Sequence, residues 1–433
     1  MKDTETLRYL ESLRIFGSNY GLERTEKLLE KLGNPHKKIK LIHIAGTNGK
    51  GSTSSILGSI LISHGYKVGF FNSPHLEDIE ETIRINNENI KEEEFIQLIN
   101  EVKVYVNEVI EEGFNHPTEF EVLTCIMFLY LYRKNVDFGI VEVGLGGRLD
   151  STNVINPILS IITSISLDHI NILGDNIKEI AKEKCGIIKK NTPVVTCIQK
   201  NEALEVIIEK SSLMNSNLII SNPNNFKFIN VEFNDKIYQE VSFKFNEKEE
   251  SLKLKLLGEH QITNLSLAIS AIIELNSLKY INLDIEKLKN GVFNAKWNGR
   301  LEVINKKPLI VLDGAHNLEG IEVLKRNINR YFKFNNLYII IGILKDKEVE
   351  KMVKCITPIA KKVYTLKPNS IRAEKAENLK EIVRRYNDNV EAFDDYNEAI
   401  KDVLSKVTKD DLILVCGSLY MIGNIRSLFY NFI

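Results

Sequence analysis

The residues best suited to chemistry lie between positions 41 and 52, in the stretch LIHIAGTNGKGS. Its first half is apolar, as in a buried strand, and its second half is a glycine-rich turn that leads into a helix. The glycines Gly46, Gly49 and Gly51 allow the backbone to turn its N–H groups toward one point, where phosphate oxygens can bind at the start of the helix. Lys50 adds a positive charge for the terminal phosphates, and Ser52 adds a hydroxyl for Mg²⁺. The stretch therefore predicts a nucleoside triphosphate site.

The spacing of this loop departs from the common phosphate-loop pattern G-x-x-x-x-G-K-[ST]. Counting back from Gly49 and Lys50, the first glycine position is occupied by Ile44, and Gly51 separates Lys50 from Ser52. A glycine turn with a purely structural role is therefore the alternative. The combination of strand, lysine and following helix favours phosphate binding.

Length and composition restrict the class of protein. At 433 residues the chain is longer than one hydrophobic core usually supports, so we expect two or three domains. Lysine and arginine (57) balance aspartate and glutamate (58), so no overall charge attracts nucleic acid or an anionic membrane. The five cysteines include no C-x-x-C pair, and the first ten residues, MKDTETLRYL, carry no apolar export signal. We expect a cytoplasmic monomer that acts on small molecules and has no nucleic-acid or membrane partner.

The order of the predicted elements indicates an α/β fold. Apolar strands and amphipathic helices alternate after the phosphate loop, whereas residues 226–257 show the period-two alternation of a small antiparallel ribbon. The strand–helix alternation resumes over residues 309–416, as in a doubly wound domain. We expect a larger N-terminal domain over 1–297, with a parallel sheet and the ribbon, and a smaller Rossmann-like C-terminal domain over 298–433.

Glu142 lies within an otherwise apolar segment, FGIVEVGLGG, at residues 138–147. A carboxylate in an apolar strand is costly unless it is paired or bound to a metal ion, so Glu142 is a candidate Mg²⁺ ligand. His169 follows the next predicted strand, residues 157–164. Because the carboxyl ends of parallel strands meet at one edge of a sheet, we expect both side chains at that edge. For a lone histidine, a structural role is the alternative.

Several strings in the chain resemble, in order, those of one family. Together they are similar to the Mur ligase superfamily, in its folylpolyglutamate synthase and dihydrofolate synthase branch. Two positions depart from the family's pattern: Ser151 stands where alanine is commoner, and Asn298 replaces a proline, which implies a less rigid linker. The strings are AGTNGKGS (45–52), SPHL (73–76), TEFE (118–121), GLGGRLDSTN (144–153), GEHQITN (258–264), WNGR (297–300) and DGAHN (313–317).

This resemblance implies a role for individual residues. It implies that Lys50, Lys184 and His169 are catalytic, and that Ser73, Glu142 and His169 bind Mg²⁺. It also implies that CO₂ carbamylates Lys184 to an anion that helps to position the metal ion, an ordinary surface lysine being the alternative. The residues that the resemblance assigns to ATP are Thr47, Asn48, Gly49, Lys50, Gly51, Ser52, Asn264, Arg300, Asp313 and His316.

The resemblance further places Thr118, Phe120, Glu121 and Asp150 at the pterin-bearing substrate. Thr118 with Glu121 three residues later is also a helix capping box, and both interpretations can hold together.

The implied reaction is ATP-dependent formation of an amide between a pterin-containing carboxylate and the amino group of L-glutamate, through an acyl phosphate, with release of ADP and phosphate. Two other classes of protein are alternatives. A phosphate-loop switch or motor has no place for the DGAHN and GLGGRLD strings, and a cell-wall Mur ligase shares the ATP machinery without the SPHL and TEFE strings. Dihydropteroate, tetrahydrofolates or both remain open as acceptors.

Overall fold

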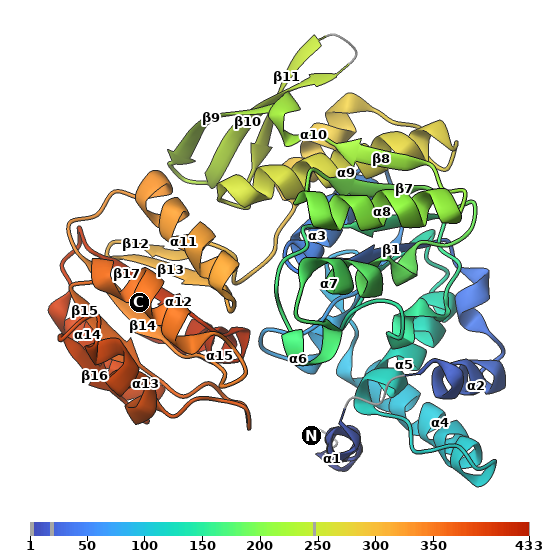
Figure 1. The fold of residues 1–433 in the computed structure, drawn as a ribbon, viewed down its shortest axis with the longest axis horizontal. Coiled ribbons are helices and arrows are strands. Elements are labelled where there is room, and N and C mark those ends of the chain that lie inside the picture. The colour runs from blue at the N-terminus through green and yellow to red at the C-terminus, as the bar shows by residue number, and fades with distance from the viewer. Residues whose placement is uncertain (1–3, 18–20, 246–247, 433) are drawn as a thin grey trace. The chain divides into compact units, whose positions relative to one another are not determined.

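The computed structural model describes residues 4–17, 21–245 and 248–432. Within the chain, contacts define two compact units, and each contains its own parallel sheet (Figure 1). Unit 1 comprises Met1–Lys227, Ser242–Lys253 and Ile262–Ala295, and unit 2 comprises Phe228–Val241, Leu254–Gln261 and Lys296–Ile433.

Unit 1 is built on an eight-stranded sheet with the strand order β4-β3-β2-β5-β1-β6-β7-β8. The strands from β2 to β8 in this order run parallel, and β3 and β4 are added antiparallel at one end. The strands are β1 Leu41–Ala45, β2 Val68–Phe71, β3 Ile83–Ile85, β4 Glu88–Asn89, β5 Phe138–Glu142, β6 Leu159–Ile162, β7 Val194–Cys197 and β8 Leu218–Ser221.

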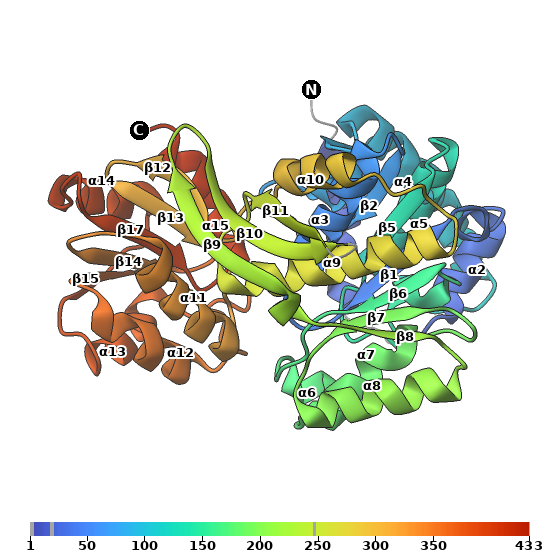
Figure 2. The same ribbon diagram turned by 90° about the horizontal axis from the view of Figure 1, so that it is seen from above.

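Helices cover both faces of this sheet (Figure 2). Side chains of α7 and α8 pack on the face that carries Ala45 and Ile162, and α3 packs on the opposite face, where Gly58 lies against Phe70 and Ile140. The helices are α1 Thr4–Ser12, α2 Glu23–Lys31, α3 Lys50–Ser63, α4 Glu92–Glu111, α5 Glu119–Arg133, α6 Ile170–Leu173, α7 Ile177–Lys184, α8 Asn201–Leu213, α9 Glu259–Ser277 and α10 Ile285–Asn294.

The strand register aligns the carboxyl ends of four neighbouring strands. Ile44 of β1 pairs with Glu142 of β5, and Ala45 pairs with Ile162 of β6. On the other side of β5, Val141 pairs with Phe71, the last residue of β2. The segments that follow β2, β5, β1 and β6 therefore begin at the same level, which is where parallel sheets bind ligands.

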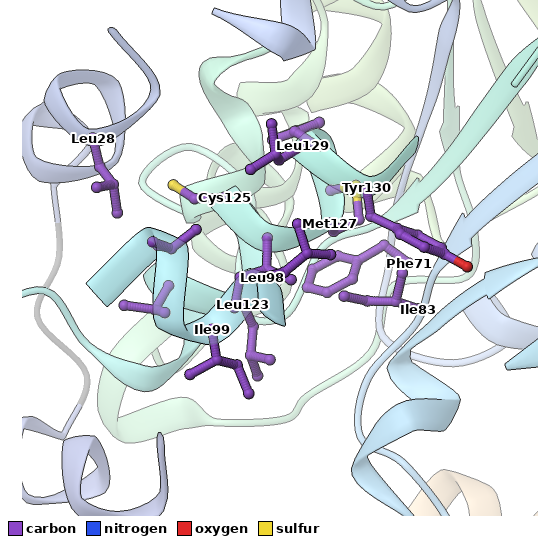
Figure 3. Packing of buried hydrophobic residues seen from close by; sticks show 14 of the residues in the cluster. Leu28, Phe71, Ile83, Leu98, Ile99, Leu123, Cys125, Met127, Leu129 and Tyr130 are labelled. Carbon is purple, nitrogen blue, oxygen red and sulfur yellow. The ribbon is translucent and has the colours of Figure 1, made fainter. Parts of the chain in front are cut away.

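A large apolar core joins α4 and α5 to the sheet (Figure 3). Leu98 and Ile99 of α4 lie near Leu123 and Met127 of α5, and Phe71 extends the cluster to β2. The pattern of residues 91–112 predicts a polar amphipathic helix on the solvated surface, but one face of α4 is buried in this core. Burial of such a side chain contributes about 2 kcal/mol, so α4 is an integral part of the unit.

Unit 2 contains a six-stranded sheet with the order β12-β13-β17-β14-β15-β16, in which β12 is antiparallel to β13 and the other pairs are parallel. Asp313, Cys416 and Ile341 align at the carboxyl ends of three neighbouring strands. The strands are β12 Glu302–Lys306, β13 Leu309–Asp313, β14 Leu337–Ile341, β15 Lys362–Thr365, β16 Val390–Ala392 and β17 Leu412–Cys416. The helices are α11 Leu318–Tyr331, α12 Val349–Ile356, α13 Ala376–Arg384, α14 Tyr396–Lys406 and α15 Leu419–Phe429.

The predicted ribbon forms a separate three-stranded sheet, in the order β11-β10-β9. Its strands are β9 Phe226–Phe233, β10 Ile237–Phe245 and β11 Lys248–Leu254. The parts of β9 and β10 that belong to unit 2 are fixed to α11. The Tyr331 hydroxyl donates to Gln239 Oε1 of β10 at 2.9 Å, and the Phe228 ring of β9 meets the Tyr331 ring edge-on.

Most predicted elements occur close to their predicted bounds, and the deviations have local causes. Residues 3–33 have helical periodicity, and the described part of this stretch holds α1, a short 3-10 turn at Leu13–Phe16 that ends at Gly17, and α2. Gly17 has φ 61°, a left-handed conformation that ends a helix readily. Along the parts of the chain that the structure describes, no helix combines the length and hydropathy needed to cross a membrane.

A buried ion pair between α2 and α5 gives a test of this packing. Arg24 Nη2 lies 3.0 Å from Glu121 Oε1, and both side chains are almost inaccessible to solvent. Arg24→Leu strands the buried carboxylate, and we expect it to lower the free energy of unfolding by about 3 kcal/mol in urea denaturation. The matched control is Arg14→Leu, which breaks an exposed pair with Glu119 and should cost less than about 1 kcal/mol. Equal losses for the two variants would contradict this assignment.

Candidate active site

The glycine-rich loop takes the conformation that its sequence predicts. Gly46 has φ 150° and Gly49 has φ 89°, which residues with a side chain rarely adopt. A Cβ at Gly46 would overlap the Thr163 hydroxyl, and one at Gly49 would overlap the Asn264 carboxamide. Gly51, by contrast, lies in the first turn of α3. Two of the three glycines therefore form the turn, and the third belongs to the helix.

The loop is fastened to the segment that follows β6. Thr47 N donates to Ser164 O at 2.8 Å, and the Thr47 hydroxyl donates to Ser166 O at 3.1 Å. The Ser164 hydroxyl in turn donates to Asn48 O at 3.2 Å. These bonds hold the loop in place without a ligand. Because Gly49 caps α3 and has no side chain, the first N–H groups of the helix are not capped by it and suit an anion.

Lys50 folds back over the loop. Its ammonium group donates to the carbonyl oxygens of Gly46 and Thr47, both at 3.2 Å, and lies 3.8 Å from Glu142 Oε1. Phosphate oxygens are stronger acceptors for an ammonium group than neutral carbonyls are. The lysine is therefore already beside the place where the loop amides converge.

A second lysine reaches the same carbonyl. Lys184, at the end of α7, is buried, and its amine donates to Gly46 O at 2.8 Å. Burial, and secondly the positive charge of Lys50, lower the pKa of Lys184 to about 7. The alternative that Lys184 is an ordinary surface lysine is therefore wrong.

Glu142 is buried at the end of β5, as its place in an apolar strand predicted. Its Oε2 accepts a hydrogen bond of 2.8 Å from the carboxamide of Asn72, the residue after β2. Ser73 is the second residue after β2, Glu142 is the last residue of β5, and His169 lies in the segment after β6. The three predicted Mg²⁺ ligands thus lie at or beyond the carboxyl ends of three strands of one sheet. Their role as ligands stays a prediction. The described residues contain no cluster of three or more His, Cys, Asp or Glu side chains arranged for a metal ion, and the predicted set has only two residues of those types.

The turn after β5 supports Lys184. Arg148 N donates to Glu183 O at 2.8 Å, and a Cβ at Gly147 would overlap that same carbonyl. The GLGGR string thus packs directly on the end of α7. Tight contact here requires glycine, because the backbones of the turn and the helix touch.

Asp150 is engaged within this turn. Its Oδ2 accepts from Leu145 N at 2.9 Å and its Oδ1 from Thr152 N at 3.0 Å, while Thr152 Oγ1 lies 2.8 Å from His43 Nε2. Burial raises the pKa of Asp150, and these donors oppose the shift. The carboxylate holds the turn together, and its predicted contact with the pteridine stays a prediction.

Thr118 and Glu121 form the capping box that was one interpretation of TEFE. Thr118 N donates to Glu121 Oε2 at 2.7 Å, and Glu121 N donates to Thr118 Oγ1 at 3.3 Å. The ring of Phe120 lies 5.6 Å from that of Phe71 and covers Gly144. Phe120 is thus placed beside the turn after β5, and substrate contact remains a prediction for all three residues.

In unit 2, Asp313 ends β13 and binds two backbone amides. It accepts from Leu301 N at 2.9 Å and from Ala315 N at 2.8 Å. Burial raises the pKa of Asp313, and the charge of Arg300 opposes the shift. His316 Nδ1 lies 2.8 Å from Gly314 O. The structure thus brings Arg300, Asp313 and His316 together within unit 2, and their contacts with ATP stay predictions.

The sequence did not predict two residues that are linked to Glu142 by hydrogen bonds. Asn72 contacts the carboxylate directly, and the Arg84 guanidinium donates to Asn72 Oδ1 at 3.0 Å. Arg84 lies in the string EETIRIN, where a charged residue in a short apolar strand was the available signal. Asn72 stands directly before SPHL, and nothing in its local pattern distinguishes it from a loop residue.

Comparisons with known proteins agree with this geometry. Residues 44–272 match the family described as Mur ligase middle domain, and residues 299–419 match Mur ligase, glutamate ligase domain. The dihydrofolate synthase/folylpolyglutamate synthase of Bacillus subtilis is 39% identical over 419 residues, which cover 95% of each chain. The chain belongs to the Mur ligase family, in its folylpolyglutamate and dihydrofolate synthase branch.

Solved structures give the same result. The folylpolyglutamate synthase of Thermotoga maritima has a TM-score of 0.84 and 35% identity, and the match covers 100% of this chain and 98% of that one. A structure of the Mycobacterium tuberculosis folylpolyglutamate synthase, complexed with ADP and AMPPCP, has a TM-score of 0.88 and 28% identity over 98% of both chains.

The shifted pKa of Lys184 predicts how stability depends on pH. In the folded chain this pKa is about 7, lowered from 10.5, so between these values the unfolded chain binds a proton that the folded chain does not. The free energy of unfolding of the wild type should therefore rise with pH over this range, relative to Lys184→Met. Urea denaturation of both proteins from pH 7 to pH 10 in CO₂-free buffer measures the difference. A difference that does not change with pH would contradict the lowered pKa.

Proposed function

We propose that this protein is an ATP-dependent amide ligase. It joins the amino group of L-glutamate to the carboxylate of a pterin-containing acid, dihydropteroate or a reduced folate, and releases ADP and phosphate. The observation that carries the proposal is the convergence of Lys50 and Lys184 on the Gly46 carbonyl, beside the buried Glu142, in a chain of this family. An ordinary structural turn has no need for two lysines at one carbonyl.

The chemical problem is that a carboxylate is a poor electrophile. In the proposed first step, the acceptor carboxylate attacks the γ-phosphorus of ATP, the bond to the bridging oxygen breaks, and ADP leaves. The glutamate ammonium group first releases a proton to solvent, the resulting amine attacks the acyl carbon of the acyl phosphate, and the nitrogen releases a second proton to solvent or phosphate as the amide forms. The C–N bond forms and phosphate leaves. Lys50 and the loop amides stabilise the charge on the transferring phosphoryl group.

The residues at the sheet edge fit a divalent cation of the Mg²⁺ type. Glu142 is a buried carboxylate with Oε1 facing the loop lysine, and a hydroxyl (Ser73) and an imidazole (His169) follow β2 and β6 of the same sheet. Oxygen donors suit Mg²⁺, which usually binds one or two carboxylates together with substrate phosphates. Ser73, Glu142 and His169 would hold the ion, and it would neutralise phosphate charge.

We further propose that Lys184 reacts with CO₂ to form a carbamate. Only the uncharged amine can react, and a pKa of about 7 leaves much of it uncharged near neutral pH. The product is an anion in place of a cation, which relieves the repulsion by Lys50 and favours a nearby metal ion.

Pterin binding is proposed for Thr118, Phe120, Glu121 and Asp150; of these, Phe120 lies against Gly144 in the turn after β5, and Asp150 belongs to that turn. We assign ATP and pterin binding to an N-terminal domain over 1–297 and glutamate ligation to a C-terminal domain over 298–433. The protein is proposed to work as a monomer in the cytoplasm, where a reducing environment keeps its five free cysteines as thiols.

The proposed reaction predicts glutamate-dependent release of ADP. We expect turnover with dihydropteroate or a reduced folate and none with a UDP-linked muropeptide, followed by a coupled ADP assay. Lys50→Ala should lower kcat by about 10²–10³-fold, because it removes one donor from the transferring phosphoryl group. Lys354→Ala, an exposed lysine of α12, is the matched control. ADP release that does not depend on glutamate would contradict the proposal.

The carbamate predicts chemical rescue. Lys184→Ala should be inactive, and short carboxylic acids such as acetate or propionate should restore part of the activity, because they supply the missing anion in the space left by the side chain. The same acids should not rescue Lys50→Ala. Loss of activity in Lys184→Ala without any rescue would count against the carbamate.

A further inference from the structure

The carboxamide of Asn72 is held from three sides. Its Nδ2 donates to Glu142 Oε2 at 2.8 Å and to Ser54 Oγ at 3.2 Å, and its Oδ1 accepts from Arg84 Nη2 at 3.0 Å. The residue is 2% exposed. Turning the amide over would place its oxygen against a carboxylate and its NH₂ group against a guanidinium. Asn72 therefore has one orientation, with its donors toward Glu142 and Ser54.

Packing fixes the outer partner. Arg84 lies in β3, which pairs antiparallel with β2, and its guanidinium lies 4.8 Å from the centroid of the Phe70 ring. A charged donor on Oδ1 polarises the amide and strengthens the hydrogen bonds that the NH₂ group donates. The order of the contacts is therefore Arg84, then Asn72, then Glu142.

These contacts fix the orientation of the Glu142 carboxylate. Oε2 accepts from Asn72, and Oε1 lies 3.8 Å from Lys50 Nζ, toward the phosphate loop. The main chain at Glu142 is fixed by its pairing with Ile44 of β1. With the backbone and one carboxylate oxygen held, the second oxygen has a defined direction. The group that donates to Oε2 is a neutral amide.

We propose that Asn72 is a positioning residue, which holds Glu142 in the orientation in which Oε1 serves the divalent cation of a bound nucleotide. The inference rests on the role proposed above for Glu142. Residues that orient a ligand in this way typically contribute 10–100-fold to metal affinity or activity.

The test measures how strongly Mg²⁺ promotes nucleotide binding. Binding of the β,γ-methylene analogue of ATP to the full chain is followed by calorimetry, once with MgCl₂ and once with EDTA. The ratio of the two affinities reports the metal ion alone. We expect Asn72→Leu, which has nearly the same size and no donor, to lower this ratio by about 10–100-fold and to change the affinity in EDTA by less than about twofold.

A second variant changes Arg84, the residue that donates to Asn72 Oδ1. Arg84→Met leaves Asn72 and Glu142 in place but removes the bond that fixes the amide, so the ratio should fall in the same direction and by less. This variant decides the question if Asn72→Leu does not fold. Ser211→Ala is the matched control: it removes another buried side-chain hydrogen bond of unit 1, to Ile207 O in α8, and should leave the ratio unchanged.

Glu142→Gln distinguishes the role of Asn72 from the role of Glu142. If Glu142→Gln abolishes the effect of Mg²⁺ and Asn72→Leu does not change it, the inference is overturned and the role proposed for Glu142 stands. If Glu142→Gln also leaves the ratio unchanged, the role of Glu142 fails and the inference fails with it. Equal loss of affinity in MgCl₂ and EDTA would show a structural role for Asn72 only, and would likewise overturn it.

Discussion

Two lysine side chains converge on one backbone carbonyl, that of Gly46, and the rest of the site is arranged around this constraint. Lys50 approaches it from the start of α3 and Lys184 from the end of α7. Burial lowers the pKa of Lys184 first, and the positive charge of Lys50 beside the shared acceptor lowers it further. Negative charge at this point, from phosphate or from carbamylation, relieves the constraint.

The sheet supplies the geometry. β1 lies between β5 and β6, so the phosphate loop emerges between the segment that carries Glu142 and the segment that carries His169. Hydrogen bonds from Thr47 to Ser164 and Ser166 close the loop against the β6 side. The GLGGR turn after β5 touches the end of α7 and fixes the position of Lys184. The phosphate loop, Glu142 and Lys184 are therefore held by segments that begin at the carboxyl ends of strands of one sheet.

Local signals in the sequence predicted much of this arrangement. The phosphate loop, the capping box of α5, the strand that ends at Glu142 and the alternation of unit 2 are all encoded within short windows, where glycine, proline and hydrophobic periodicity act directly. Resemblance to a family added roles, such as that of Lys184, which periodicity alone does not distinguish from a surface lysine.

Contacts between distant segments were not predictable in this way. The bonds of Asn72 to Ser54 and Glu142 depend on three different strands and helices, and no spacing along the chain reports them. Gly17 ends the first helical segment within residues 3–33, and the hydrogen bond from Tyr331 to Gln239 ties part of the ribbon to unit 2. Periodicity says which face of a strand is apolar, but it does not say which partner covers that face.

The place where the phosphate chain of ATP binds decides whether the glycine-rich loop is the nucleotide site. A crystal structure of the protein with a non-hydrolysable ATP analogue measures this directly. We expect the β- and γ-phosphates against the N–H groups of residues 49–52, with the Lys50 ammonium moved from the carbonyls of Gly46 and Thr47 onto phosphate oxygens. An analogue whose phosphates lie away from this loop, with Lys50 still bonded to those carbonyls, would contradict this assignment.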